Sequence, residues 1–191
     1  MKRIMKRAFK LIVLSIILAI THNIVIFSQA PDESYFEKNL PGQHHQLLHK
    51  FKGLWKMNFG ILAGEESIYG SGIAENLIIN TGRHIQMNLN FNAKGEQIKG
   101  LIIIGYNGFT EKYYFFGIDQ ISTPATYCEG YYNESTKQLI FEGENKEIDK
   151  DNPIHFKIVF SFVRDDKITY DRYSTINGKE VKTFECSLVR N

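Results

Sequence analysis

Hydrophobic and polar residues alternate with a period of two along most of the chain after residue 53, and short turn signals separate the alternating runs. This pattern is typical of β-strands that show one face to a core and the other to solvent. It predicts ten strands, at Leu54–Ile61, Ser67–Ile79, Arg83–Asn92, Gln97–Asn107, Lys112–Asp119, Ala125–Asn133, Lys137–Glu144, Ile154–Arg164, Lys167–Thr175 and Glu180–Arg190. Nearly all connectors are too short for a crossover helix, so the strands run up and down.

The segment before the first strand predicts a short helix. Pro41 marks its start and Gly53 its end, so the helix covers Pro41–Lys52 and leads directly into Trp55. Ten consecutive antiparallel strands would expose two edges in an open sheet. We therefore predict an all-β fold, an up-and-down antiparallel β-barrel of about 8–10 strands capped by this helix, with a two-sheet sandwich as the alternative. A barrel of this strand number has room for a ligand.

The first thirty residues have the features of a secretory signal peptide. Five Lys and Arg residues lie within the first ten, an apolar run follows over 11–27, and Ser28-Gln29-Ala30 forms a small-x-small cleavage site. An uncleaved anchor is the alternative, but polar residues interrupt the run, which is shorter than the ~20 residues that a bilayer requires. We expect a signal peptide at residues 1–30, a polar lead-in at 31–40 and one barrel domain at 41–191. The protein is then exported, and is periplasmic or secreted.

Removal of the leader changes the charge balance. It leaves 18 of the 23 Lys and Arg residues against 21 Asp and Glu residues, a net charge of −3. No basic cluster persists, so we expect neither nucleic acid nor, after leader cleavage, a membrane as a partner. Cys128 and Cys186 either form a disulfide after export or stay buried free thiols, and free thiols are the simpler interpretation.

Several short motifs occur in a fixed order. They are Pro41-Gly42-x-x-His45-x-x-Leu48, Gly53-x-Trp55, Thr81-Gly82-Arg83, Gly105-Tyr106-Asn107, Ile118-Asp119, and Gly178-Lys179-Glu180 followed by Glu185 and Arg190. In their order and spacing the chain resembles the domain-of-unknown-function family 1579 from about Leu40 to Arg190. It departs from the family pattern at Gly117, where a tryptophan is common, and at Asn107, which replaces an aspartate. The resemblance implies a lipocalin-like, or calycin-like, barrel whose biochemical role is not established.

Four residues are predicted to be structural. Trp55 and Arg190 fall on core-facing positions of the first and last strands, which become neighbours when a barrel closes. Lipocalins similarly stack an arginine on the tryptophan of their Gly-x-Trp motif, so a cation–π contact is expected here. Together with Gly53 and with His45 of the capping helix, this pair is expected to close the base of the barrel.

The histidines do not predict a metal or haem site. His45 and His49 lie four apart on the helix, but the HExxH motif is absent and no third ligand stands at a known spacing. His84 and His155 share the solvent faces of their strands with polar residues, whereas haem needs an inward histidine. We therefore expect no metal and no cofactor.

Polar residues among apolar strand positions are the candidates for ligand binding: Arg83, Tyr106, Asp119 and Glu185. Arg83 is in phase with the inward Ile85, and a buried charge must either pair or meet a polar group of a ligand. The alternative for Arg83 and Asp119 is a salt bridge at the barrel mouth. The alternation places Glu185 outward, so only the family resemblance points to it.

Aromatic residues cluster in Tyr113–Phe116 and in Tyr131-Tyr132. Half of each cluster faces inward, to line a pocket or fill the core, and the outward half sits in solvent or forms a patch for a homodimer. We prefer a non-catalytic barrel that binds a small amphipathic or aromatic ligand, because catalytic motifs are missing. One alternative is an enzyme with Asp119 or a histidine as general acid or base and Arg83 holding an anion. Another is an interaction partner of a second envelope protein.

Overall fold

A computed structural model describes residues 33–63, 66–145 and 153–191 of the protein. The predicted signal peptide at 1–30 lies outside these residues. The chain divides into two units, Met1–Leu40 and Pro41–Asn191. In the described part of the first unit, the predicted polar lead-in contains a short helix, α2 (Glu33–Lys38), without buried residues. None of the helices within the described ranges is long and apolar enough to cross a membrane.

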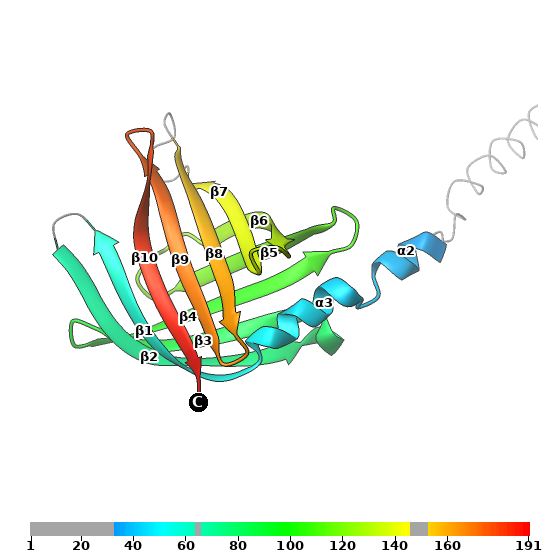
Figure 1. The fold of residues 1–191 in the computed structure, drawn as a ribbon, viewed down its shortest axis with the longest axis horizontal. Coiled ribbons are helices and arrows are strands. Elements are labelled where there is room, and N and C mark those ends of the chain that lie inside the picture. Colours follow the sequence, from blue (N-terminus) through cyan, green and yellow to red (C-terminus); the bar gives the residue numbers. More distant parts are fainter. Residues whose placement is uncertain (1–32, 64–65, 146–152) are drawn as a thin grey trace, which may run out of the picture. The chain divides into compact units, whose positions relative to one another are not determined.

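The second unit is a closed barrel of ten antiparallel strands (Figure 1). The strands are β1 (Gly53–Ala63), β2 (Glu66–Ile79), β3 (His84–Ala93), β4 (Glu96–Asn107), β5 (Lys112–Asp119), β6 (Thr126–Asn133), β7 (Gln138–Asn145), β8 (Ile154–Arg164), β9 (Lys167–Ile176) and β10 (Lys179–Arg190). Each strand pairs with its neighbours in sequence, and β10 returns to pair with β1. The prediction of an all-β, up-and-down barrel is confirmed, and the two-sheet alternative is wrong.

Two tight hairpin turns follow directly from the residues in them. Lys94-Gly95 joins β3 to β4 with φ values of 50° and 84°, and Asn177-Gly178 joins β9 to β10 with φ values of 50° and 73°. Positive φ at both central positions gives a turn whose twist matches that of the flanking strands. The glycines make this conformation inexpensive, so these turns fix the register of both hairpins.

The alternating strand directions give the barrel two ends. The helix end is where β1 begins at Gly53 and β10 ends at Arg190, and two short helices precede β1 there: α3 (Gln43–Leu48) and η1 (His49–Phe51) (Figure 1). Together α3 and η1 correspond to the predicted capping helix. The cavity end is where β5 ends at Asp119 and β10 begins at Lys179.

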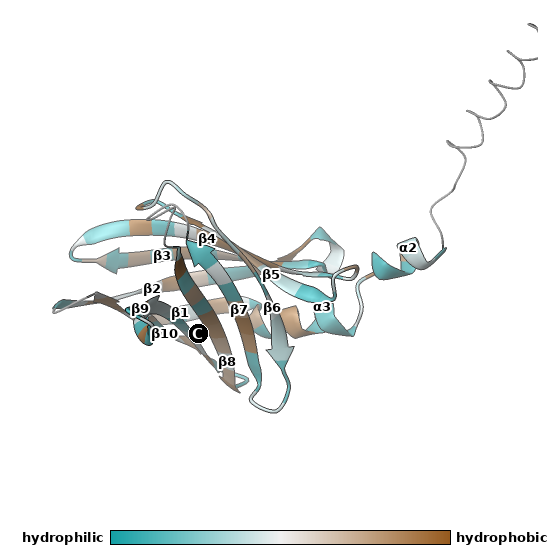
Figure 2. Cartoon of the chain, turned by 90° about the horizontal axis from the view of Figure 1, so that it is seen from above, coloured by the Kyte–Doolittle hydropathy of each residue, from teal (hydrophilic) through white to brown (hydrophobic). Residues whose placement is uncertain are grey.

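The core is tightest toward the helix end. Fully buried side chains there include Leu48, Phe51, Trp55, Ile85, Ile104 and Phe160, each 0% exposed. Each such side chain contributes about 1.5–3 kcal/mol of burial free energy. Toward the cavity end, inward residues such as Leu89, Phe91 and Phe184 are only partly buried. Figure 2 shows the hydrophobic and hydrophilic residues alternating along the strands that produce this inner face.

Candidate functional site

The helix end is closed by Trp55 and Arg190. The buried indole of Trp55 donates from Nε1 to the carbonyl oxygen of Phe51 at 2.7 Å. The guanidinium of Arg190 lies over the indole, with Cζ 4.3 Å from the ring centroid, as the sequence predicted. Its Nη1 donates to the carbonyl oxygen of Lys52 at 2.5 Å and its Nη2 to that of Asp165 at 3.3 Å. These bonds join the capping segment to β10 and to the β8–β9 turn, so this arginine is committed to structure.

Gly53 allows this closure. Its φ of +121° lies in the region that L side chains rarely adopt. A Cβ at this position would also lie 2.8 Å from Nη1 of Arg190. A glycine is therefore required both by the backbone and by the arginine that packs beside it.

His45 is a buried capping residue, 7% exposed. Its Nδ1 accepts a hydrogen bond from the backbone N–H of Gly42 at 3.1 Å, which places the proton of the neutral ring on Nε2. Burial, assisted by the nearby charge of Arg83, lowers the pKa of His45 below its usual value of 6.5. Since Nδ1 is used by the cap, the ring is poorly placed to bind a metal, and the described residues contain no group of three metal-ligating side chains.

Tyr106 of β4 packs against α3. Its ring stacks on His44 with centroids 4.3 Å apart and planes at 13°, and it meets the edge of Tyr113 at 5.0 Å. The hydroxyl of Tyr113 donates to the carbonyl oxygen of His44 at 3.0 Å. Burial raises the pKa of Tyr106. The structure therefore places this candidate ligand-binding residue at the helix end, under the capping helix.

Arg83 is half-buried and lies outside strand β3. It follows the short helix η2 (Asn80–Gly82), in which all three residues have positive φ, and itself adopts a helical conformation before β3 begins. Its Nη1 donates to the hydroxyl of Thr81. The predicted strand began at Arg83, whereas β3 begins at His84, so the alternation that put Arg83 in phase with Ile85 does not extend to it. Arg83 also lies at the helix end, whereas Asp119 lies at the other, so the predicted mouth salt bridge does not form.

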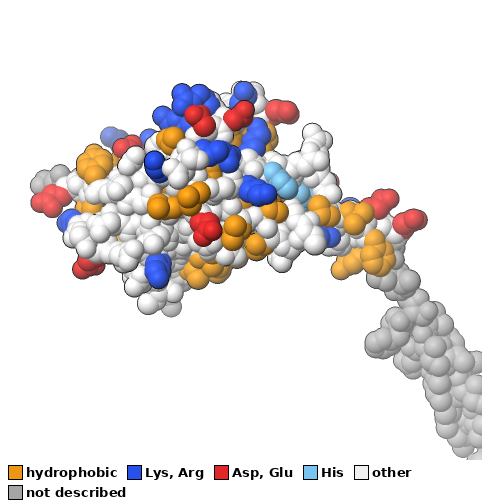
Figure 3. Space-filling model, turned by 90° about the horizontal axis from the view of Figure 1, so that it is seen from below, with side chains coloured by type: hydrophobic (Ala, Val, Ile, Leu, Met, Phe, Trp, Pro, Cys, Tyr) orange, Lys and Arg blue, Asp and Glu red, His pale blue; other side chains and the backbone are white. Residues whose placement is uncertain are grey.

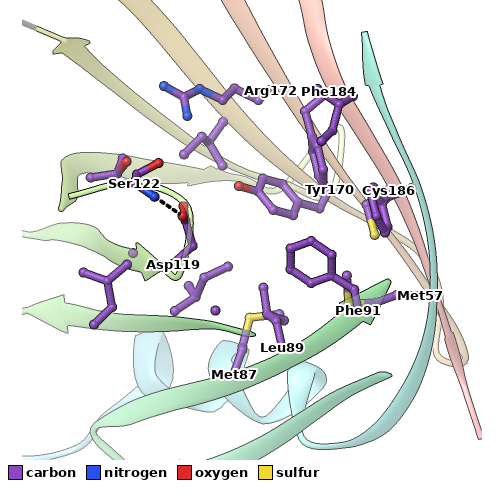
Figure 4. A pocket seen from close by; sticks show the side chains of 18 of the residues that line it. Met57, Met87, Leu89, Phe91, Asp119, Ser122, Tyr170, Arg172, Phe184 and Cys186 are labelled. Carbon is purple, nitrogen blue, oxygen red and sulfur yellow. Dashed lines mark hydrogen bonds between the residues drawn. The ribbon is translucent and has the colours of Figure 1, made fainter. Parts of the chain in front are cut away.

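The cavity end contains an apolar cavity of about 380 Å³ (Figure 4). Its walls come from eight strands and the loop after β5. They include Met57, Leu89, Phe91, Ile102, Phe184 and Leu188. Both the volume and the mostly apolar lining are typical of sites for small organic ligands.

Two glycines help to leave this space open. Gly100 of β4 and Gly117 of β5 both line the cavity. A Cβ on Gly100 would meet only ordinary contacts, 3.6 Å from Leu89, whereas one on Gly117 would lie 2.8 Å from the ring of Phe115. At position 117 the sequence resemblance leads to an expected tryptophan, and the glycine here removes that bulk from the cavity wall.

Asp119 lies at the rim of the cavity, and one oxygen of its carboxylate is hydrogen-bonded to the loop that follows it. Its Oδ1 accepts hydrogen bonds from the backbone N–H groups of Ile121 at 2.8 Å and Ser122 at 2.7 Å (Figure 4). This is an Asx-type turn, which holds the loop after β5 in place. Asp119 is the one sequence-predicted ligand-binding residue that the structure places on the cavity wall.

Tyr170 and Arg172 of β9 supply the polar side of the cavity, and the sequence analysis missed both. They lie two residues apart on the inward face, and in Figure 4 the Tyr170 hydroxyl and the Arg172 guanidinium point toward the loop that carries Asp119. The guanidinium lies over the Phe156 ring, with Cζ 4.6 Å from the centroid. Burial raises the pKa of Tyr170, and the charge of Arg172 opposes that shift. The adjacent pair Asp171-Arg172 could have predicted a charge inside the barrel, because one of two neighbouring strand residues must face inward.

Glu185 lies on the outer wall, as its alternation predicted. It pairs across β1 with Gly60, and its Oε2 lies 3.7 Å from Nζ of Lys182. Lys182 also binds Asp171 at 3.2 Å. Glu185 therefore belongs to an exterior charge cluster and does not line the cavity.

Both cysteines are buried free thiols. Burial raises the pKa of Cys128 and that of Cys186 to about 12, so both are protonated at neutral pH. Only thiolates are good nucleophiles. Cys186, which lines the cavity, therefore acts there as a small apolar wall residue.

Outward aromatic side chains are dispersed over the barrel. Tyr69, Tyr127 and Tyr131 are 67%, 59% and 52% exposed. On the barrel face that Figure 3 shows, hydrophobic side chains lie in small groups between charged ones. The predicted homodimer patch stays a prediction.

Comparison with known protein families gives one match. The family described as "Protein of unknown function (DUF1579)" matches residues 40–190, which include α3, η1 and the barrel. This agrees with the resemblance drawn from the short motifs. No curated protein matches the chain. The description of the family carries no activity, so function must be argued from the cavity.

Proposed function

Because the chain belongs to the DUF1579 family, whose description assigns no activity, we propose its function from its cavity: it binds a small amphipathic or aromatic ligand without converting it. The observation that carries the proposal is the apolar cavity of about 380 Å³ at the cavity end, with polar groups gathered on one side. Binding sites for small molecules combine an apolar wall with a few polar groups in this way.

The same geometry supports binding over catalysis. An acid–base enzyme needs two titratable groups that converge on the substrate. Of the residues that line the cavity, none is a histidine, and Oδ1 of Asp119 is held by two backbone N–H groups. The thiol of Cys186 is protonated, and Arg83 lies at the other end of the barrel.

The cavity volume limits the size of the ligand. A water molecule occupies about 30 Å³ in the liquid, so the space corresponds to about a dozen water molecules. A fused two-ring aromatic or an alkyl chain of moderate length fits this space, whereas a phospholipid does not.

The test is a fluorescence titration of the purified protein with N-phenyl-1-naphthylamine, an uncharged aromatic probe that brightens in apolar surroundings. We expect saturable binding. Gly100→Leu should weaken it at least about 10-fold, because the new side chain enters the cavity while its Cβ makes only ordinary contacts. Lys99→Leu adds the same side chain on the outward face of the same strand and is the matched control. Non-saturable binding, or equal loss in both variants, contradicts the proposal.

We also propose that the protein acts after export, in the periplasm or outside the cell. This rests on the sequence of residues 1–30, where basic residues, an apolar run and a small-x-small site follow one another. Recovery of a mature N-terminus at Pro31 is the corresponding check.

A further inference from the structure

At the polar side of the cavity, the guanidinium of Arg172 has no acidic partner among the described residues, and this narrows the chemical class of the ligand. We propose that the ligand is a monoanionic amphiphile, with a carboxylate held by Arg172 and Tyr170 and an apolar chain lying along the wall toward the barrel centre. This inference rests on the proposed function, because it names the ligand class of the same cavity.

Arg172 supplies the positive charge at the polar side of the cavity. Its guanidinium is half-buried and makes no hydrogen bond or ion pair within the described ranges of the chain, where the Phe156 ring is its neighbour at 4.6 Å. The arginines elsewhere show the usual pattern: Arg190 donates to backbone carbonyls, and Arg164 pairs with Asp166 at 2.9 Å. A partly desolvated guanidinium without an acceptor is costly. Its planar fork of N–H groups matches the two oxygens of a carboxylate.

Tyr170 provides a second donor beside it. Its hydroxyl lies on the same face of β9, projects into the cavity in Figure 4, and has no hydrogen-bond partner among the described residues. The raised pKa of Tyr170 keeps that hydroxyl protonated, and therefore a donor, at neutral pH. Two unused donors that converge on one side of an apolar cavity favour an acceptor with negative charge.

Asp119 limits the charge of the ligand. Its carboxylate stands on the same rim, and its Oδ1 already accepts from Ile121 and Ser122. It forms no ion pair with Arg172 among the described residues. A single negative charge on Arg172 is tolerated beside this carboxylate, whereas a second negative charge would be repelled. A carboxylate thus suits the rim better than a phosphate dianion.

The remaining wall suits an alkyl chain. Below the rim, the apolar side chains of the lining include Met57, Leu89, Phe91, Ile102 and Leu188. These surfaces offer no hydrogen-bond donors or acceptors to a ligand beyond the rim. The head of the ligand is therefore fixed at β9 and its chain extends into apolar space.

The experiment is displacement of bound N-phenyl-1-naphthylamine by decanoate and by decan-1-ol, which share a chain and differ in the head. We expect decanoate to bind at least about 10-fold more tightly than decan-1-ol. Arg172→Gln should weaken decanoate about 10- to 100-fold, the usual effect of losing hydrogen bonds to a charged group, and change decan-1-ol less than about threefold. Arg164→Gln removes the same charge from the outer surface and should leave both affinities unchanged.

Two further variants sharpen the test. Tyr170→Phe removes only the hydroxyl and should weaken decanoate about 3- to 10-fold. Asp119→Asn keeps an oxygen for the turn but removes the negative charge, so decanoate should bind equally well or more tightly. If Arg172→Gln does not fold, Arg172→Lys replaces it. Lysine keeps the charge without the fork and should weaken decanoate about 3- to 10-fold.

The outcomes separate this inference from the proposed function. If the probe binds but decanoate and decan-1-ol compete equally, or Arg172→Gln affects both alike, the anionic head is wrong and the binding function stands. If the probe shows no saturable binding to the wild-type protein, the proposed function fails and this inference fails with it. Tighter binding of decyl phosphate dianion than of decanoate would overturn the assignment to carboxylates.

Discussion

The two ends of the barrel are built by the same ten strands but are filled differently. At the helix end, Phe51 of the capping segment contacts Phe160 and Phe162, with ring centroids 5.2 Å and 5.1 Å away, and both Phe51 and Phe160 are fully buried. At the cavity end, Gly100 and Gly117 replace side chains on the wall and about 380 Å³ stays open. The alternation of inward and outward residues is the same in both halves. What differs is the volume of the inward side chains.

The two ends also differ in how their polar groups are hydrogen-bonded. At the helix end, Trp55, Arg190 and His45 are all hydrogen-bonded to the backbone, and Oδ1 of Asn76 is the buried exception. At the cavity end, the donors of Arg172 have no acceptor among the described residues. Satisfied polar groups stabilise a fold, whereas unsatisfied groups beside a cavity indicate a place for a ligand. One end therefore maintains the structure, and the other has the features of the binding site that we propose.

Aromatic truncation should separate the ends most clearly. Trp55→Ala should lower the free energy of unfolding by about 3–5 kcal/mol, because it empties a packed core and removes the surface on which Arg190 stacks. Phe91→Ala should cost about 1–2 kcal/mol, because part of its ring already faces the cavity. Denaturant midpoints measure both. Equal losses would show that the cavity end is packed as tightly as the helix end.

A pair of glycine substitutions tests how strained the helix end is. Gly53→Ala should cost about 2–3 kcal/mol, since its φ of +121° disfavours an L side chain and its Cβ would lie 2.8 Å from Arg190. Gly178→Ala at the cavity end has φ +73° and nothing within 4 Å, so it should cost about 1 kcal/mol. The comparison uses the same denaturant measurement. If Gly178→Ala costs as much, the contact with Arg190 adds nothing.

The smallest expected difference concerns pH. Burial is the main cause that lowers the pKa of both His45 and His84 from 6.5 in the folded protein, and both belong to the helix end. The unfolded chain therefore binds more protons below about pH 6.5, and stability falls as the pH decreases through that value toward the lowered pKa.

Thermal denaturation between pH 7.5 and 5 measures this slope. His45→Gln keeps an acceptor for the N–H of Gly42 and should flatten the slope. A slope that His45→Gln leaves unchanged would contradict the assignment of this pH dependence to the helix end.

The sequence predicted the strands and the closure well because both are local or periodic properties. All ten strands start and end within two residues of the predicted bounds, since turn residues such as Lys94-Gly95 mark each reversal. The stack of Arg190 on Trp55 followed from their positions on the first and last strands. These features can be predicted without knowing how the side chains pack inside the barrel.

The sequence predicted the site poorly, because the site depends on the total volume of the inward side chains and on local breaks in the strand alternation. Arg83 was placed inward by counting back along β3, but three residues with positive φ precede it and redirect the chain. Arg172 was missed because it stands beside Asp171, and alternation requires only that one of two neighbouring strand residues faces inward. The cavity itself is the difference between the barrel volume and the volume of all its inward side chains. No local pattern reports that difference.

The seam between β1 and β10 has a consequence for how the molecule is made. Trp55 pairs with Arg190, so the first strand keeps one edge unpaired until the last strand has left the ribosome. Contacts this distant in sequence form slowly, and an open edge invites pairing with other chains in the meantime. The barrel can thus be completed only after synthesis of its last strand has finished. Until then the nascent chain has no closed barrel and can still pass through a narrow channel, which is consistent with the export that we propose.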